Sequence, residues 1–340
     1  MRRILGAIGA GVLLAALASG CGGESADATS DGGTVEGGET TLALVAYSTP
    51  REVYAQLTKD FAATDEGAGV SFQESYAASG EQSRAVAAGL PADVVAFSLE
   101  PDVTRLVDEG LVDASWNEDE HDGMVSDSVV VFAVRKGNPE GIRTWDDLTR
   151  EGIEVITPNP FTSGGAQWNV MAAYGAQLEL GKSKEEAIEY LNRLFHNVSV
   201  QDKSAREALQ TFVGGKGDVL IAYENEAILA QDKGEELDYV VPDQTILIEN
   251  PIAVVSEGGK TERAQAFVDF VRSPQAQRVF GEAGYRPILE DVLAEFEYPA
   301  PPQLFTIADL GGWGSVREEF FDVEGGIMAN IQRELGQALE

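Results

Sequence analysis

Residues 155–180 read "VITPNPFTSGGAQWNVMAAYGAQLEL", and this stretch decides the expected fold. Its short apolar start has the composition of a buried strand, and the part from "QWN" onward has helical spacing. Between the two lies a turn of small residues, "NPFTSGG". Such a turn between a strand and a helix is a common place to hold an anion, because the first N–H groups of a helix lack intrahelical partners.

The same alternation of strand and helix runs through the rest of the chain. "TLALVAYS" (41–48), "GVSFQESY" (69–76) and "ADVVAFS" (92–98) read as strands, and a helical pattern follows each of them. "DVLIAYE" (218–224) continues the series after the opening stretch. Short β-branched runs separated by helical patterns of about 10–15 residues indicate βαβ units. The sequence therefore predicts an α/β fold with mostly parallel sheets.

Two longer β-rich runs, at 128–136 and 246–255, bracket a middle block of the chain. Strands at these points fit passages between two lobes, and the chain length favours two lobes over one large sheet. We predict a first lobe made of residues 41–130 and 251–340 and a second lobe made of residues 131–250. Each lobe is expected to hold a mostly parallel sheet flanked by helices.

The N-terminal segment reads as a targeting signal. Arg2 and Arg3 precede an apolar run that is shorter than the roughly 20 residues of a spanning helix, and the run ends at the single cysteine, Cys21. Cys21 resembles the cysteine of a bacterial lipobox, which implies a signal peptide at 1–21 and a lipid anchor; an incidental thiol is the alternative. Residues 22–40 contain almost nothing apolar and are predicted to form a flexible tether.

The charge balance narrows the classes of partner. The chain carries 24 Lys and Arg against 57 Asp and Glu, a net charge of −33. We therefore expect no nucleic acid partner, because phosphate backbones are bound through Lys and Arg. The charge fits a soluble surface outside the cytoplasm, either periplasmic or lipid-anchored on the outer face of the cytoplasmic membrane.

Four strand-to-helix turns share one chemistry. Three carry a capping-box pattern and one carries two glycines: "YSTPRE" (47–52), "AASGEQ" (77–82), "DKSARE" (202–207) and "FTSGGAQ" (161–167). Each helix N-terminus holds about half a positive charge, so several that converge form an anion site without a charged side chain. Ordinary helix capping is the alternative for any one turn. Four turns at strand carboxyl ends favour a ligand site, since open α/β sheets bind ligands there.

Signatures of catalysis and of cofactor binding are absent from the sequence. It lacks the P-loop, dinucleotide and nucleophile-elbow patterns, and its two histidines are His121 and His196. We expect no metal, no cofactor and no catalytic residue, since an enzyme would need a nucleophile–base pair or a metal cluster. The acidic run "NEDEHD" (117–122) reads as a solvated loop, with a cation site as the alternative.

These stretches closely resemble the sulfate/thiosulfate-binding proteins of bacterial ABC importers. The resemblance runs in order from about residue 41 to 335 and rests on "VITPNPFTSGGAQWNVMAAYGA", "AYSTPREVY", "ASGEQSRAVAAGLPADVV", "VRKGNPEGIRTWDDL", "GDVLIAYENEA", "NPIAVV", "GYRP" and "LFTIADLGGW". It implies a two-lobe, type II periplasmic-binding-protein fold with two hinge crossovers. It further implies that backbone N–H groups hold sulfate, or thiosulfate, between the lobes for delivery to an ABC permease. We expect the protein to be a monomer.

The resemblance also assigns the site residues. Ser163 matches a serine that donates its hydroxyl, and Tyr223 stands where the family has a tryptophan that donates its indole N–H. The remaining positions match backbone donors: Ser48, in place of an Asp, Ser79, Gly164, Gly165 and Ala205.

Tyr223 is the departure that leaves the ligand open. A phenol oxygen accepts as well as donates, and molybdate-binding relatives use a tyrosine in their site, so a carrier of molybdate, tungstate or phosphate remains an alternative. A ligand-sensing subunit, which would share the site but not the permease, is another. Tyr223 itself has a core-packing alternative. Arg51 and Arg206 each lie just inside a site helix. They either brace the surroundings of the anion or pair with acidic neighbours.

Overall fold

The computed structural model describes residues 40–256, 259–337 and 339. Its strands are β1 (Thr40–Tyr47), β2 (Val70–Ala77), β3 (Val94–Ala96), β4 (Met124–Arg135), β5 (Val155–Ile156), β6 (Val198–Val200), β7 (Val219–Tyr223), β8 (Leu237–Val240), β9 (Gln244–Val254) and β10 (Gln303–Phe305). They follow the order β2-β1-β3-β9-β4-β7-β5-β6, with β10 on β9 and β8 on β4. The predicted signal peptide (1–21) with Cys21, and the predicted tether up to residue 39, lie outside the described residues.

Lobe I contains the parallel strands β2, β1 and β3. Alternate residues of β1 face opposite sides, as the period of two in a strand requires. Leu42 and Leu44 join a core with Phe61 on one side, whereas Val45 joins a core with Phe97 on the other side. The helices that cover these two faces are α1 (Arg51–Ala62), α2 (Ser79–Ala87), α3 (Glu100–Asp108), α8 (Thr261–Val271), α9 (Pro274–Glu282) and α10 (Glu290–Leu293).

Lobe II contains the strands β5 to β8, of which β5 pairs in parallel with both β6 and β7. Its helices are η1 (Trp145–Thr149), α4 (Gly164–Glu179), α5 (Lys184–His196), α6 (Ala205–Val213) and α7 (Glu224–Asp232). Helix α4 grows out of the opening stretch of the sequence and is buried on nearly every side, since both Trp168 and Met171 are fully buried. It therefore lacks the polar stripe of a surface helix.

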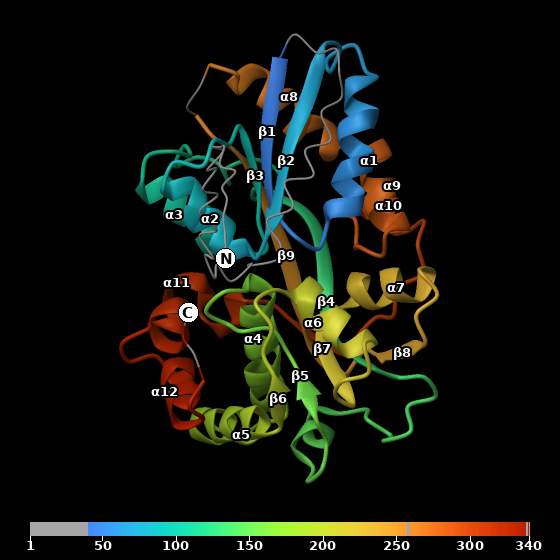
Figure 1. Cartoon of the computed structure of the whole chain (residues 1–340), viewed down its shortest axis with the longest axis vertical. Helices are drawn as coiled ribbons and strands as arrows, with labels where there is room; N and C mark the ends of the chain where they lie inside the picture. Colours follow the sequence, from blue (N-terminus) through green and yellow to red (C-terminus); the bar gives the residue numbers. More distant parts are fainter. Residues whose placement is uncertain (1–39, 257–258, 338, 340) are drawn as a thin grey trace, which may run out of the picture. The chain divides into compact units, whose positions relative to one another are not determined.

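The two long strands β4 and β9 connect the lobes and pair with each other antiparallel. The end of β9 pairs antiparallel with β3 of lobe I, while the end of β4 pairs antiparallel with β7 and β8 of lobe II. Figure 1 shows both strands running between the blue strands and the green and yellow helices. Within each lobe the strands other than β4 and β9 pair in parallel, as predicted. The pairs that involve β4 or β9 with β3, β7, β8 or each other are antiparallel, because the chain passes from lobe I to lobe II along β4 and returns along β9.

The C-terminal segment differs from its predicted place. Residues 251–340 were assigned to lobe I, but the segment from β10 onward packs on lobe II, beside α4 and α5 (Figure 1). The Trp313 and Trp168 rings lie 4.7 Å apart, and Gly175 leaves space on α4 for the Phe305 ring. The apolar pattern of a helix does not reveal which lobe the helix covers. The predicted lobe boundaries near residues 130 and 250 stay a prediction. The elements are η2 (Ala308–Leu310), α11 (Gly312–Val316), η3 (Arg317–Phe321) and α12 (Ile327–Glu334).

No helix in the described part of the chain combines the length and the apolar character that crossing a bilayer requires.

Candidate functional site

A small cavity lies between the lobes, and all seven predicted ligand-binding residues line it. Its volume is about 10 Å³, which is too small for a sugar or a peptide. Small and hydroxyl-bearing residues dominate the lining: Tyr47, Ser48, Thr49, Ala78, Ser79, Ser98, Ser163, Gly164, Gly165, Ser204, Ala205 and Tyr223. No charged side chain belongs to this set. Hydrogen bonds from backbone N–H and hydroxyl groups are therefore what the cavity offers a ligand.

On lobe II the cavity lies at the starts of α4 and α6. Ser163 caps α4, accepting from the Ala166 N–H at 3.4 Å, and Ser204 caps α6, accepting from the Glu207 N–H at 3.2 Å. Each cap occupies the third N–H group of its helix and leaves the earlier ones without an intrahelical acceptor. The earlier N–H groups that line the cavity belong to Gly164, Gly165 and Ala205.

On lobe I the predicted caps are wrong by one residue. The N-cap of α1 is Pro50 rather than Thr49, and the N-cap of α2 is Ala78 rather than Ser79; neither has a side-chain cap bond. The Ser79 hydroxyl instead donates to Asp102 Oδ2 at 2.6 Å and accepts from the Ser98 N–H at 3.0 Å. As the first residue of α2, Ser79 keeps its own N–H free of intrahelical bonds. The predicted backbone donor at this position thus survives the corrected cap.

Two glycines in the opening turn stand in different surroundings. A Cβ on Gly164 would lie 2.9 Å from both Cβ and Oγ of Ser98 and 2.9 Å from Cγ of Leu99. A Cβ on Gly165 would meet its nearest neighbours, among them Ala205 and Tyr223, at an ordinary 3.5 Å. A glycine is therefore needed at position 164 because Ser98 and Leu99 of lobe I pack closely against it. This holds whether or not a ligand also approaches the glycine.

Tyr223 ends β7 and reaches the cavity from lobe II. Its hydroxyl lies 2.7 Å from the Ser98 hydroxyl of lobe I, and the side chain is buried. Burial raises the pKa of the Tyr223 phenol well above its ordinary value, so the group stays protonated and is able to donate. Ser98 was not predicted, because it carries no motif beyond its place at the end of a strand.

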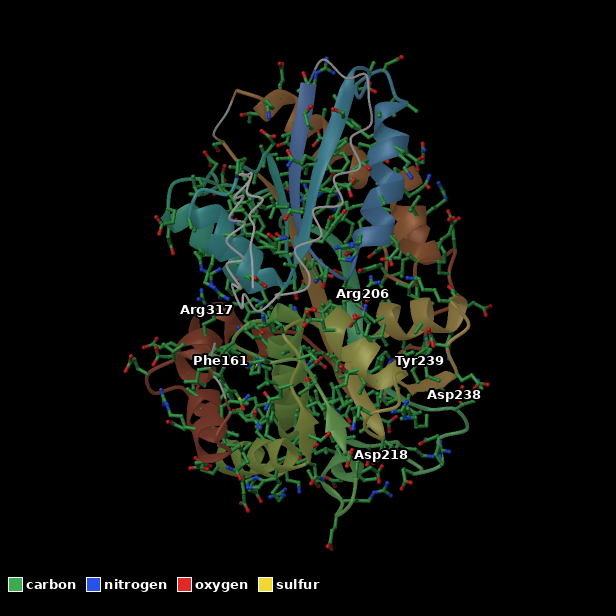
Figure 2. The ribbon with its side chains drawn as sticks, viewed as in Figure 1. Phe161, Arg206, Asp218, Asp238, Tyr239 and Arg317 are labelled. Carbon is green, nitrogen blue, oxygen red and sulfur yellow. The ribbon has the colours of Figure 1, made fainter. Side chains whose placement is uncertain are left out.

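Arg206 crosses between the lobes, whereas Arg51 does not reach the cavity. Figure 2 labels Arg206, which lies at the start of α6. Its guanidinium donates to the Thr49 carbonyl at 2.9 Å and to both carboxylate oxygens of Glu52, at 2.7 and 2.8 Å. Lys233 also contacts Glu52, at 2.7 Å. Arg206 therefore pairs with an acid and also bonds the backbone beside the cavity, while its role in bracing the surroundings of the anion stays a prediction. Arg51 lies over the Tyr76 ring, 5.1 Å from its centre.

The charge on Glu52 follows from these contacts. Burial disfavours its carboxylate, but the hydrogen bonds from Arg206 and Lys233 outweigh burial and lower the pKa of Glu52 to about 2. The group is thus ionised at neutral pH and ties α1 of lobe I to α6 and α7 of lobe II.

The acidic side chains that follow or precede the cavity residues closely in sequence are absent from its lining. Glu224 pairs with Arg286 at 2.8 Å. Glu226 is fully buried, and burial raises its pKa to about 7 against the opposing charge of Arg206. Asp202 accepts from the Asn159 N–H through its backbone carbonyl. Among the described residues, no cluster of three or more His, Cys, Asp or Glu is placed to hold a metal ion, at 117–122 or elsewhere.

Comparison with known proteins decides the class of the chain. The model of the bacterial extracellular solute-binding protein family matches residues 42–286. The chain belongs to this family. This solute-binding protein is 40% identical over 326 residues to the sulfate-binding protein of Synechococcus elongatus, covering 92% of this chain and 91% of the relative. It is 32% identical over 304 residues to the thiosulfate-binding protein of Pseudomonas aeruginosa, covering 85% and 91%.

Solved structures give the fold of this solute-binding protein independently. The sulfate-binding protein SubI from Mycobacterium tuberculosis H37Rv superposes with a TM-score of 0.81 at 48% identity, covering 83% of this chain and 100% of SubI. The periplasmic binding protein AfuA from Actinobacillus pleuropneumoniae superposes with a TM-score of 0.63 at 20% identity, covering 88% and 98%. These neighbours confirm the predicted two-lobe periplasmic-binding-protein fold and the predicted resemblance.

Proposed function

We propose that this solute-binding protein captures sulfate between its lobes and delivers it to an ABC permease, without an enzymatic step. The observation that carries the proposal is the lining of the cavity, which offers N–H and hydroxyl donors but neither a carboxylate nor a cation. Sulfate at neutral pH bears no proton, so a lining of donors matches all of its oxygens. The names of the curated relatives, sulfate- and thiosulfate-binding proteins, support the same ligand class.

The proposed roles follow the cavity. Ser163 donates its hydroxyl to the anion while its oxygen accepts from the Ala166 N–H. Tyr223 donates its phenol O–H, and Arg206 holds the Thr49 backbone in place. The backbone donors are Ser48, Ser79, Gly164, Gly165 and Ala205.

The acidic surface does not oppose this role at contact distance. The net charge of −33 is screened beyond about 8 Å at physiological ionic strength, whereas aligned N–H dipoles act directly on the bound oxygens. Most side chains of the lining are buried, and a hydrogen bond is stronger in such a low-dielectric environment than in water.

Selectivity against hydrogen phosphate follows from the same lining. Hydrogen phosphate brings a proton that needs an acceptor, and no carboxylate is part of the cavity lining. A buried donor without an acceptor costs about 1–3 kcal/mol, which corresponds to about 5- to 150-fold weaker binding.

The cellular setting completes the proposal. We place the protein outside the cytoplasm, in the periplasm or held by a lipid on Cys21 to the outer face of the cytoplasmic membrane, as a monomer that docks on its permease when closed. Replacement of Cys21 by Ser in the native host tests the anchor. The protein should then move from the membrane fraction to the soluble fraction, and an unchanged membrane fraction would contradict the lipid anchor.

Calorimetry on the desalted protein tests the ligand. Sulfate, thiosulfate, molybdate and phosphate are titrated separately, and sulfate is expected to bind with a micromolar or lower Kd and phosphate at least about fivefold more weakly. Absence of sulfate binding at millimolar concentration would overturn the proposal. So would a clear preference for molybdate or phosphate over sulfate.

A further inference from the structure

Two hydroxyl groups from opposite lobes meet inside the cavity. Ser98 follows β3 of lobe I and Tyr223 ends β7 of lobe II, and their oxygens lie 2.7 Å apart. Both side chains are buried and both line the cavity. Because the bond joins the two lobes, a movement that separates the lobes would break it.

The backbone N–H and carbonyl of Ser98 both have hydrogen-bond partners within the protein, so the hydroxyl is the polar group that Ser98 can direct into the cavity. Its N–H donates to the Ser79 hydroxyl at 3.0 Å. Its carbonyl accepts from Trp168 Nε1 at 2.8 Å and from Asn250 Nδ2 at 3.2 Å. These three partners come from lobe I, from α4 of lobe II and from β9, so the position of Ser98 is fixed from both lobes and from the strand between them.

The two hydroxyls carry two protons, and their mutual bond uses one of them; the Asn250 side chain is a further hydrogen-bond partner of the Tyr223 phenol. The other proton is left for a ligand, whichever group donates. A phenol is the more acidic of the two and hence the better donor to an anion. The arrangement with the better energy therefore has Ser98 donating to the Tyr223 oxygen and Tyr223 donating to the ligand, because a hydroxyl that accepts one hydrogen bond donates more strongly.

We propose that Ser98 is a specificity-determining residue that occupies the Tyr223 oxygen on closure and so commits Tyr223 to donating to the oxyanion. The inference rests on the proposed function and refines it. A free phenol is able to accept a hydrogen bond as well as donate one, and would supply the acceptor that hydrogen phosphate needs. With Ser98 bonded to it, the phenol presents a donor only, as an indole N–H would. Ser98 thus keeps the cavity selective for an unprotonated dianion.

The test compares sulfate and phosphate affinities in matched variants. Wild type, Ser98→Ala, Tyr223→Phe and the double variant are titrated at about pH 8, above the second pKa of a phosphate group, where phosphate is mostly a singly protonated dianion. Ser98→Ala should weaken sulfate binding by only about threefold but lower the sulfate-over-phosphate ratio by about tenfold. Tyr223→Phe should weaken sulfate binding by about 5- to 150-fold.

The double variant and a control separate this role from a structural one. In the double variant no phenol remains to accept the phosphate proton, so the ratio should return toward that of Tyr223→Phe. The control is Ser71→Ala, which removes a buried hydroxyl bonded at 3.0 Å to the Thr41 hydroxyl, in lobe I and off the cavity wall. It should leave the ratio unchanged.

The outcomes are distinguishable. If the wild type binds sulfate and Ser98→Ala keeps the wild-type ratio, the role given to Ser98 is wrong and the proposed function stands. The same holds if the double variant shows the same fall in ratio as Ser98→Ala, since the phenol would then not be the acceptor. If the wild type does not bind sulfate, the proposed function itself fails.

Discussion

The two walls of the cavity both present helix N-termini, but they are held in place by different means. On lobe II, Ser163 and Ser204 each cap their own helix through a residue three positions along the chain. On lobe I, the helices begin after Pro50 and Ala78, which provide no side-chain cap. The lobe I wall depends on distant partners instead, namely Asp102 for Ser79 and Arg206 for the Thr49 carbonyl.

The difference separates local from long-range stabilisation. A serine cap contributes about 1 kcal/mol and needs only its own helix. The bond from Ser79 to Asp102 is buried and involves a charged acceptor, so its loss costs more, about 1.5–3 kcal/mol. We therefore expect substitutions on lobe I to be more costly than the corresponding cap substitutions on lobe II, and substitutions where the walls meet to act on ligand binding.

The largest effect on binding is expected where the walls meet, at Gly164→Ala. The added Cβ would approach Ser98 and Leu99 to 2.9 Å and hold the lobes apart. Overpacking of this kind costs about 1–3 kcal/mol, so sulfate binding should weaken by about 5- to 150-fold. The thermal stability of the ligand-free protein should change little.

The matched variant Gly165→Ala, whose Cβ has ordinary 3.5 Å contacts, should bind sulfate more tightly than Gly164→Ala in the same calorimetric titration. Equal losses would show that closure is not the cause.

Ser79→Ala is expected to have the next largest effect, on folding stability. It removes the 2.6 Å donor of the buried Asp102 and the acceptor of the Ser98 N–H. The free energy of unfolding, measured by urea denaturation without ligand, should fall by about 2 kcal/mol. Arg105 still contacts Asp102 at 2.9 Å, which limits the loss. A change below about 0.5 kcal/mol would mean that this wall does not depend on the Asp102 bond.

Ser204→Ala should cost less, about 1 kcal/mol, because it removes only a helix cap. Ser204→Asn keeps a capping side chain and should retain most of the stability in the same denaturation experiment. If Ser204→Ala destabilises the protein as much as Ser79→Ala does, the distinction between the two walls is wrong.

The smallest effect is expected at Glu52→Gln, which breaks the tie between the walls. Glu52 is 40% exposed, and exposed ion pairs contribute about 0.2–1 kcal/mol, less at high salt. The pKa of Glu52 is lowered to about 2 in the folded protein, so its contribution is complete above its ordinary pKa of 4.5 and is lost as the pH falls toward 2. The Tm difference between wild type and variant should therefore shrink over that range. A difference that grows on acidification would exclude the ion pair as its source.

The sequence predicted the lobe II wall better than the lobe I wall for a physical reason. Ser163 and Ser204 cap their own helices, so their neighbours along the chain reveal them. In lobe I the capping-box pattern predicted the wrong partners. Gln82 bonds Ser75 at 3.0 Å and Glu52 bonds Arg206, whereas a capping box would have them bond the first residues of their own helices. Tertiary partners thus replaced the local caps that the pattern indicates.

The roles of residues that lack a local sequence pattern could not be predicted from the sequence. Ser98 joins the cavity only because β3 lies between β1 and β9, which brings its end beside α4. The C-terminal segment was placed on the wrong lobe because Trp313 and Phe305 would bury equally well on any apolar surface. Gly175 makes room for the Phe305 ring, but the sequence alone does not show that this glycine faces Phe305.

The path of that C-terminal segment has a mechanical consequence. The chain passes between the lobes three times, along β4, along β9 and through residues 299–302, which read "PAPP". The lobe I end of this third passage is pinned, since the Tyr298 hydroxyl donates to the Tyr285 carbonyl at 2.6 Å and Arg286 donates to the Pro299 carbonyl at 2.8 Å. Its other end is pinned where β10 pairs with β9. A short connection that contains three prolines cannot extend much beyond its present length, so we expect it to limit the angle to which the lobes can open.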